Sequence, residues 1–184
     1  MPVRLGVVGG FADPRWDHDR PWLKMEDAFE LAGYFGAHAI WCVADAETLV
    51  PMLAVQRRDH SVHMTRFEGA ALGDVVNSAR DRLEANPEGD TIGALFYDGY
   101  VNLPGGRTDA VIVELVEYES HGRASLALPY RHASDQDGFA IFRPKFLTVP
   151  DRSDVRALGE ALFRGVAKHE KGAAVWSKYL DESR

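Results

Sequence analysis

Apolar residues recur every three or four positions after Pro21, a spacing that places them on one face of a helix. The positions are Trp22, Met25, Phe29, Ala32 and Gly36. They predict a helix over residues 22–36. Because Gly36 offers a stop, we interpret the β-rich run at residues 40–43 as a buried strand, although it could also continue the helix. A short apolar run at residues 5–8 predicts another strand.

The same helical spacing predicts three further helices, which cover residues 48–56, 74–85 and 153–170. A short segment at residues 173–180 follows the last of them. Residues 57–63 are polar and predict a loop.

Between residues 91 and 149 the pattern changes to β-branched and aromatic runs joined by short turns rich in Gly, Pro and Asp. The predicted strands cover residues 91–103, 107–119, 124–131 and 139–149. Short joints of this kind are typical of an antiparallel meander. Helices flank this block and do not alternate with its strands, which predicts an α+β fold. We expect a single domain, residues 1–184, in which an antiparallel sheet of about four or more strands packs against helices from the N-terminal half and the C-terminus.

Composition excludes several classes of protein. The chain has 184 residues, of which 46% are hydrophobic and 27% charged, as in globular proteins. A formal net charge of −7 does not suit a nucleic-acid binder or an anionic-membrane binder. The sequence contains no apolar stretch of roughly eighteen residues, so no membrane span is predicted. Cys42 is the one cysteine, so an internal disulfide framework is excluded, and a reducing compartment, the cytoplasm, is expected.

Two short motifs resemble parts of phosphate-binding or metal-binding sites. Gly9-Gly10 follows a predicted strand, but without spaced glycines that open a helix we interpret it as a turn. On a helix, the side chains of His60 and His63 would lie on one face, whereas on a strand they would point to opposite faces. Neighbouring arginines oppose a bound cation and the ligand set is incomplete, so we predict neither metal nor cofactor.

The sequence gives little indication of a nucleophilic cysteine or serine, or of a catalytic histidine. Cys42 lies between Trp41 and Val43, and a thiol in apolar surroundings has a raised pKa and reacts slowly. No serine lies in a GxSxG motif. His169 lies on the apolar stripe of the last predicted helix, near its C-terminus. A cationic side chain is favoured at that end of a helix, so we expect a helix-end or core-edge histidine and not a catalytic one.

The predicted sheet contains an unusual set of charged residues within apolar runs. The candidate ligand or interface residues are Asp98, Tyr100, Glu114, Arg131 and Arg143. They could form a structural ion-pair network, or they could line a binding pocket in which carboxylates have perturbed pKa values. We expect Glu114 to be partly buried and held by Arg131 or Arg143, since a buried carboxylate needs a partner or a proton.

No motif is specific enough to indicate a family. The acidic charge and the lack of a catalytic motif favour a non-enzymatic protein-binding module of the inhibitor or immunity type, possible partners being basic proteins. The alternative is a small-molecule-binding protein or enzyme that uses the charged set, and a homodimer without ligand is the third class. Whether the chain is an enzyme is left open by the sequence.

Overall fold

The computed structural model describes residues 4–8 and 25–183. In chain order its elements are β1 (Arg4–Val8), α1 (Met25–Ala44), β2 (Met52–Gln56), β3 (Val62–Glu68), α2 (Leu72–Ala85), β4 (Ile92–Leu103), β5 (Gly106–Glu117), β6 (Gly122–Arg131), β7 (Ala140–Phe142), β8 (Lys145–Thr148), α3 (Val155–Lys168), α4 (Glu170–Tyr179) and β9 (Leu180–Asp181). None of the described helices combines the length and the apolar character that crossing a bilayer requires.

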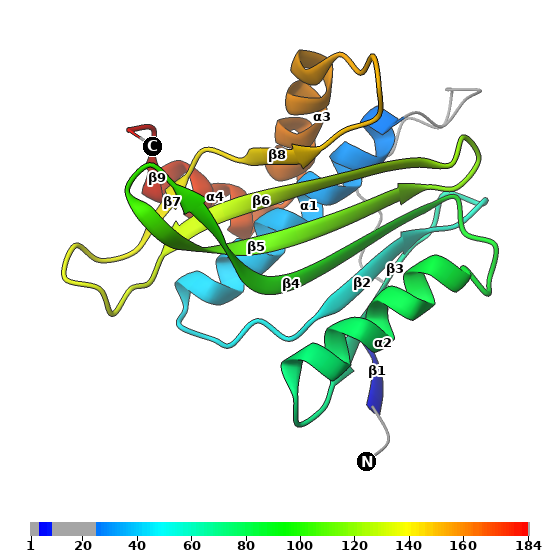
Figure 1. Cartoon of the computed structure of the whole chain (residues 1–184), viewed down its shortest axis with the longest axis horizontal. Coiled ribbons are helices and arrows are strands. Elements are labelled where there is room, and N and C mark those ends of the chain that lie inside the picture. Colours follow the sequence, from blue (N-terminus) through cyan, green and yellow to red (C-terminus); the bar gives the residue numbers. More distant parts are fainter. Residues whose placement is uncertain (1–3, 9–24, 184) are drawn as a thin grey trace.

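The strands form one mixed, mostly antiparallel sheet, which confirms the α+β class (Figure 1). Its order is β1-β3-β2-β4-β5-β6-β7-β9, and β8 also pairs with β6. The pairing of β7 with β9 is parallel, and the other pairings are antiparallel. The predicted meander of β4, β5 and β6 is its centre. The turn Pro104-Gly105 joins β4 to β5, with Leu103 opposite Gly106.

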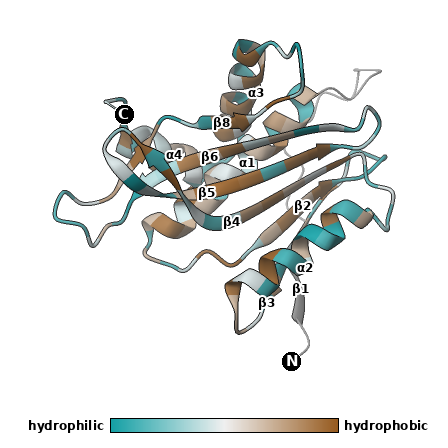
Figure 2. Cartoon of the chain, in the orientation of Figure 1, coloured by the Kyte–Doolittle hydropathy of each residue, from teal (hydrophilic) through white to brown (hydrophobic). Residues whose placement is uncertain are grey.

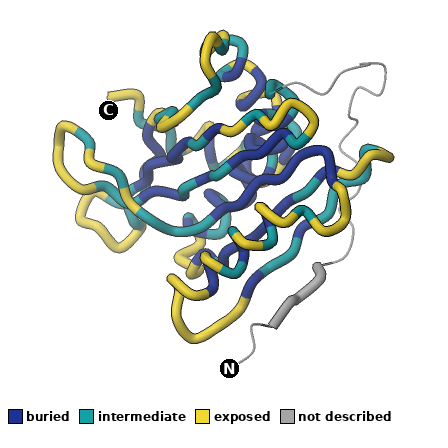
Figure 3. The backbone as a smooth tube through the Cα atoms, turned by 45° about the vertical axis from the view of Figure 1, so that its right-hand side comes forward, coloured by how far each residue is buried: buried dark blue, intermediate teal, exposed yellow. Residues whose placement is uncertain are grey.

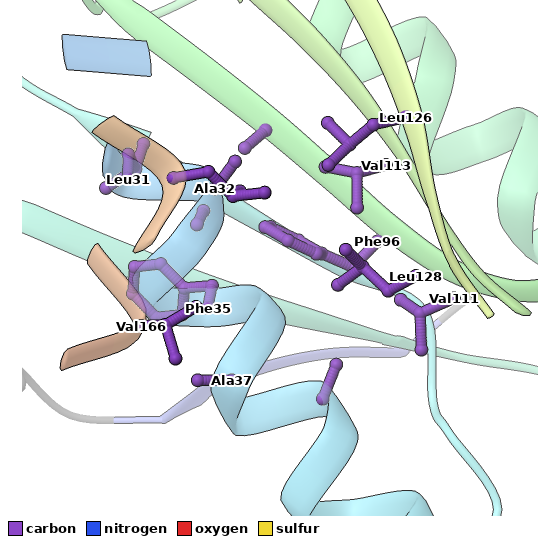
Figure 4. Packing of buried hydrophobic residues seen from close by; sticks show 14 of the residues in the cluster. Leu31, Ala32, Phe35, Ala37, Phe96, Val111, Val113, Leu126, Leu128 and Val166 are labelled. Carbon is purple, nitrogen blue, oxygen red and sulfur yellow. The ribbon is translucent and has the colours of Figure 1, made fainter. Parts of the chain in front are cut away.

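Helices cover the two faces of the sheet unequally. Phe96 and Leu95 are successive residues of β4 and therefore point to opposite faces. Phe96 belongs to the larger core beneath α1, which Figure 4 shows, while Leu95 belongs to a smaller core beneath α2. Helices α3 and α4 pack against α1. The central strands are accordingly dark blue in Figure 3, the colour of buried residues.

Helix α1 is longer than the sequence predicted. It continues to Ala44, so the interpretation of residues 40–43 as a strand is wrong. Gly36 does not stop the helix but makes room for a neighbour, because a Cβ there would lie 2.8 Å from Leu128 Cδ1. Ile40 and Val43 are buried in the core as helical residues. The predicted start at residue 22 lies outside the described residues.

The region between α1 and α2 also differs from the prediction. Residues 52–56 form the strand β2, not the end of a helix. Apolar side chains lie on both faces of β2, because Met52 and Ala54 face the larger core and Leu53 faces the smaller one. The strand is also paired on both edges, with β3 and β4. Part of the predicted polar loop begins β3, in which buried Met64 and Phe67 are separated by partly exposed residues. Tertiary pairing thus overrides the local pattern.

Other predicted elements agree with the structure. Helix α2 starts two residues before the predicted residue 74 and ends at Ala85 as expected. The predicted strand 139–149 is divided into β7 and β8, which are separated at Arg143-Pro144. Proline cannot donate a ladder hydrogen bond, so a break at this position is expected.

Helices α1 and α3 approach so closely that glycines are needed at their contact. A Cβ on Gly33 would lie 1.8 Å from the carbonyl oxygen of Leu162, and a Cβ on Gly165 would lie 1.9 Å from that of Glu30. The Glu30 carboxylate also accepts from Arg164 at 3.1 Å and from Lys168 at 2.5 Å. The glycines set the distance between the helices, and the ion pairs add to the contact at its edge.

Candidate functional site

The structure separates the five predicted site residues. Asp98 and Tyr100 have the parity of Phe96 on β4 and lie on the face that α1 covers. Glu114 alternates with the core residues Val113 and Leu115 of β5 and lies on the opposite face, with α2. One pocket containing all five residues is therefore not formed.

Glu114 is held by Arg80 of α2, so its expected pairing with Arg131 or Arg143 is wrong. The Arg80 Nη2 and Nε groups donate to the carboxylate at 2.7 and 2.9 Å, and Tyr97 donates its hydroxyl at 2.7 Å. Burial alone would raise the pKa of Glu114, but the Arg80 and Tyr97 hydrogen bonds lower it overall. Glu114 lies opposite Ser125. Arg131 is six residues further along β6 (131 − 125), roughly 20 Å away at about 3.3 Å per residue.

Arg131 and Arg143 contact other parts of the chain. Arg131 donates from Nε to the carbonyl of Gly138 at 2.7 Å and from Nη2 to that of Asp137 at 3.1 Å. It thereby holds the loop between β6 and β7. Arg143 lies 3.8 Å from Glu182, and both side chains are mostly exposed.

Asp98 and Tyr100 belong to a polar group at one end of the sheet. Tyr100 is 52% exposed and lies opposite Asp109. Arg107 stacks on the Tyr100 ring, with Cζ 3.8 Å from the ring centroid. Asp109 lies 3.3 Å from Nε2 of His132, whose ring contacts that of Tyr130 edge to face. We call this group the hairpin patch: Asp98, Tyr100, Arg107, Asp109, Tyr130 and His132.

Asp98 anchors the patch to the core. The buried Tyr130 donates its hydroxyl to Asp98 Oδ1 at 2.8 Å. Burial raises the pKa of Asp98, the Tyr130 hydrogen bond opposes that rise, and the nearby Asp109 carboxylate adds to it. Two carboxylates on one face repel each other in this way, so the site favours a cation beside them.

Exposed acidic residues surround the patch. The loop that follows His132 contains Asp135 and Asp137, both exposed. This loop and the turn of the β4–β5 hairpin lie at the same end of the sheet in Figure 1, and the loop is hydrophilic in Figure 2. Within this surface the acidic residues outnumber Arg107 and Arg131, and Arg131 is occupied by loop carbonyls.

A second polar cluster lies between α1 and α4, and the sequence did not predict it. His38 Nδ1 lies 3.3 Å from Nε2 of His169, and His38 Nε2 lies 3.9 Å from Cys42 Sγ and 3.4 Å from Arg66 Nη2. The four-residue spacing of His38 and Cys42 places them on one helix face. This pairing was not predicted, because the predicted helix ends at Gly36 and residues 40–43 were predicted to form a strand.

Hydrogen bonding to the backbone fixes the tautomer of His169. His169 caps α4, and its Nδ1 accepts from the amide of Gly172 at 2.9 Å. A neutral His169 therefore carries its proton on Nε2 and can donate it to Nδ1 of His38, while Nε2 of His38 faces Arg66 Nη2, which can only donate. His169 lies at the end of α3 and at the edge of the core, as predicted, but burial lowers its pKa and so disfavours the expected cationic form.

Cys42 should react slowly with a thiol reagent in the folded protein and rapidly after unfolding. Burial is the largest cause of its raised pKa, with Arg66 partly opposing it. The measurement is the labelling rate with and without denaturant, with free cysteine as the reference for a fully exposed thiol. Equal rates in the folded and unfolded states would show that the thiol is accessible and would contradict this assignment.

His38 should make stability fall as the pH decreases from 6.5 towards 4. Burial, together with His169 and Arg66, lowers the pKa of His38 to about 4. Between that pKa and the unfolded-state pKa of about 6.5, the unfolded chain binds a proton that the folded chain does not. The contribution of neutral His38 to stability is therefore complete above about pH 6.5 and is lost progressively below it. The measurement is urea unfolding at pH 7 and pH 5.

The matched control for that measurement is His121→Gln, at an exposed turn. His38→Gln should reduce the difference in unfolding free energy between the two pH values, whereas His121→Gln should leave it unchanged. An undiminished difference in His38→Gln would contradict the assignment.

A pocket of about 130 Å³ lies between the β2–β3 hairpin and the loop before β4. Its charged residues pair with one another: Arg82 lies 2.5 Å and Arg57 3.6 Å from Glu88, and Arg57 lies 4.0 Å from Asp90. Sites for drug-sized ligands are typically about 300–1,000 Å³. The pocket contains none of the five predicted residues. Among the described residues, no group of three or more His, Cys, Asp or Glu side chains could hold a metal ion.

Neither family models nor curated proteins nor solved structures gave a match to this chain. Its function must therefore be inferred from the geometry of its own residues.

Proposed function

We propose that this chain is a non-enzymatic protein-binding module, of the inhibitor or immunity type, that recognises a basic partner through the hairpin patch. The observation that carries the proposal is the stacked, half-exposed pair of Tyr100 and Arg107 beside Asp109. Tyrosine and arginine are the residue types enriched among energetic hot spots of interfaces. Tyr100 gains rigidity from Arg107, so it loses little conformational entropy when a partner covers it.

Electrostatics supports a basic partner. The chain has a formal net charge of −7, and Asp98, Asp109, Asp135 and Asp137 lie in the patch or in the adjoining loop. Complementary charge accelerates association and excludes partners of the same sign. A cytoplasmic location is part of the proposal and agrees with the single cysteine.

The test is capture of proteins from a lysate of the cells that make this protein, with the full chain immobilised. Wild type should retain a basic protein that is released by raised salt, and Tyr100→Ala or Asp109→Asn should weaken its binding at least about tenfold. Glu84→Gln is the matched control, because it removes one charge from an exposed acidic residue of α2, outside the hairpin patch. Equal retention by wild type and both patch variants would contradict the proposed function.

A further inference from the structure

Beside the hairpin patch, one edge of β4 has no partner strand among the described residues, and we call it the open edge. Strand β2 pairs with β4 only as far as the register pair Met52 and Phe96. Strand β4 continues from Tyr97 to Leu103, and in this part the described residues pair with it only on the β5 side. Figure 1 shows β4 running past the end of β2 towards the hairpin turn.

The phase of the ladder shows which main-chain groups face this open edge. Tyr118 donates its amide to the carbonyl of Thr91 at 3.0 Å, and the adjacent register pair is Ile92 with Glu117. In an antiparallel ladder alternate residues bond to the same neighbour. Counting in steps of two from Thr91, the odd-numbered residues of β4 bond to β5. The amide and carbonyl groups of Asp98, Tyr100 and Asn102 therefore point outwards.

The sequence does little to protect this edge. Natural edge strands are commonly blocked by lysine, proline or a bulge. Residues 97–103 contain no lysine or proline, and their pairing with β5 is continuous. The charged residue on the edge strand itself is acidic, Asp98. On the neighbouring strand, Asp109 lies opposite Tyr100 and Arg107 lies opposite Asn102. An added strand that carries lysine or arginine would meet these carboxylates.

We propose that the open edge of β4 binds an extended, basic segment of the partner protein by strand addition. The proposal rests on the proposed function and names how the partner is held. Main-chain hydrogen bonds to Asp98, Tyr100 and Asn102 provide affinity, and the alternating side chains provide specificity. Lysine or arginine on the α1 face of the added strand lies beside Asp98 and Tyr100, while an apolar residue on the other face lies beside Val101.

The probe is a synthetic nine-residue peptide of alternating lysine and valine, titrated into the full-length protein and followed by NMR. Binding should slow amide hydrogen exchange of Asp98, Tyr100 and Asn102, whose amides have no partner strand among the described residues. N-methylation of alternate peptide amides should abolish binding for one set of positions and not for the other, because only one edge of an added strand faces β4. A glutamate-and-valine peptide of the same length should not bind.

The matched protein variants are Asn102→Pro and Asn102→Ala. Asn102 is exposed and its amide faces the open edge, so proline removes an edge donor without breaking the β5 ladder. Asn102→Pro should weaken peptide binding about tenfold, the effect of losing one or two hydrogen bonds, while Asn102→Ala should bind as wild type does. Circular dichroism is the check that both variants are folded.

The outcomes separate the two proposals. If binding depends on Tyr100 and Asp109 but not on N-methylation or Asn102→Pro, strand addition is wrong and the proposed function remains. If the patch variants change neither peptide binding nor partner capture, both proposals fail. If the full chain forms a dimer that Asn102→Pro dissociates, a second copy occupies the edge and the basic partner strand is ruled out.

Discussion

Replacing Gly165 with alanine should lower the free energy of unfolding by about 3 kcal/mol, although alanine favours helices over glycine by about 1 kcal/mol. The added Cβ would lie 1.9 Å from the carbonyl oxygen of Glu30 in α1. Main-chain atoms of a packed helix cannot move aside as a flexible side chain can, so α1 and α3 must separate. Separation would loosen the packing of Leu162 and Val166, both buried in the main core.

Gly33→Ala should have an effect of similar size, because its Cβ would lie 1.8 Å from the carbonyl oxygen of Leu162. The control lies in the same helix as Gly165. A Cβ on Gly159 would meet only the Phe146 ring, at an ordinary 4.0 Å, so Gly159→Ala should leave stability unchanged or raise it by up to about 1 kcal/mol.

Urea unfolding followed by circular dichroism measures all three variants. A Gly165→Ala protein as stable as Gly159→Ala would show that the two helices do not approach as closely as the structure places them.

The sequence predicted the parts of the fold in which local pattern and tertiary environment agree. Strands β4 to β6 are long and joined by short turns, and each turn specifies an antiparallel neighbour. The prediction failed for β2 because Met52 to Gln56 is buried on both faces, and a short apolar run of that kind does not distinguish strand from helix. It failed at Gly36 because a glycine that admits a neighbouring side chain is indistinguishable, in sequence, from one that ends a helix.

The candidate site was predictable only in part, for the same reason. Tyr100 and Asp109 become neighbours once the hairpin turn at Pro104-Gly105 is placed, which local signals allow. Arg80 could not be assigned to Glu114, because α2 lies on that face only through its packing on β3 and β4. The pairing of His38 with His169 likewise depends on the contact between α1 and α4.

Removing either partner of the ion pair between Glu114 and Arg80 should destabilise the protein by about 1–3 kcal/mol. The two side chains are 25% and 37% exposed, between the exposed pairs that contribute about 0–1 kcal/mol and the buried pairs whose disruption costs about 3–5 kcal/mol. The geometry is bidentate, and Tyr97 satisfies Glu114 further. The test is a double-mutant cycle of Glu114→Gln and Arg80→Met, measured by urea unfolding.

The matched control for this cycle is the pair Glu84 and Arg123, which is also bidentate but 46% and 57% exposed. Its cycle should give a coupling free energy below about 1 kcal/mol. The coupling of Glu114 with Arg80 should be larger than this.

The pH dependence of the Glu114–Arg80 coupling provides an independent check. The folded-state pKa of Glu114 is depressed, so the unfolded carboxyl, with its ordinary value near 4.5, takes up a proton first as the pH falls. The stabilisation is therefore complete above about pH 4.5 and is lost as the pH falls through the lower, folded-state pKa. A coupling that is small at pH 7, or that does not decrease on acidification, would show that Arg80 does not hold Glu114. The carboxylate would then be available to a ligand on the α2 face.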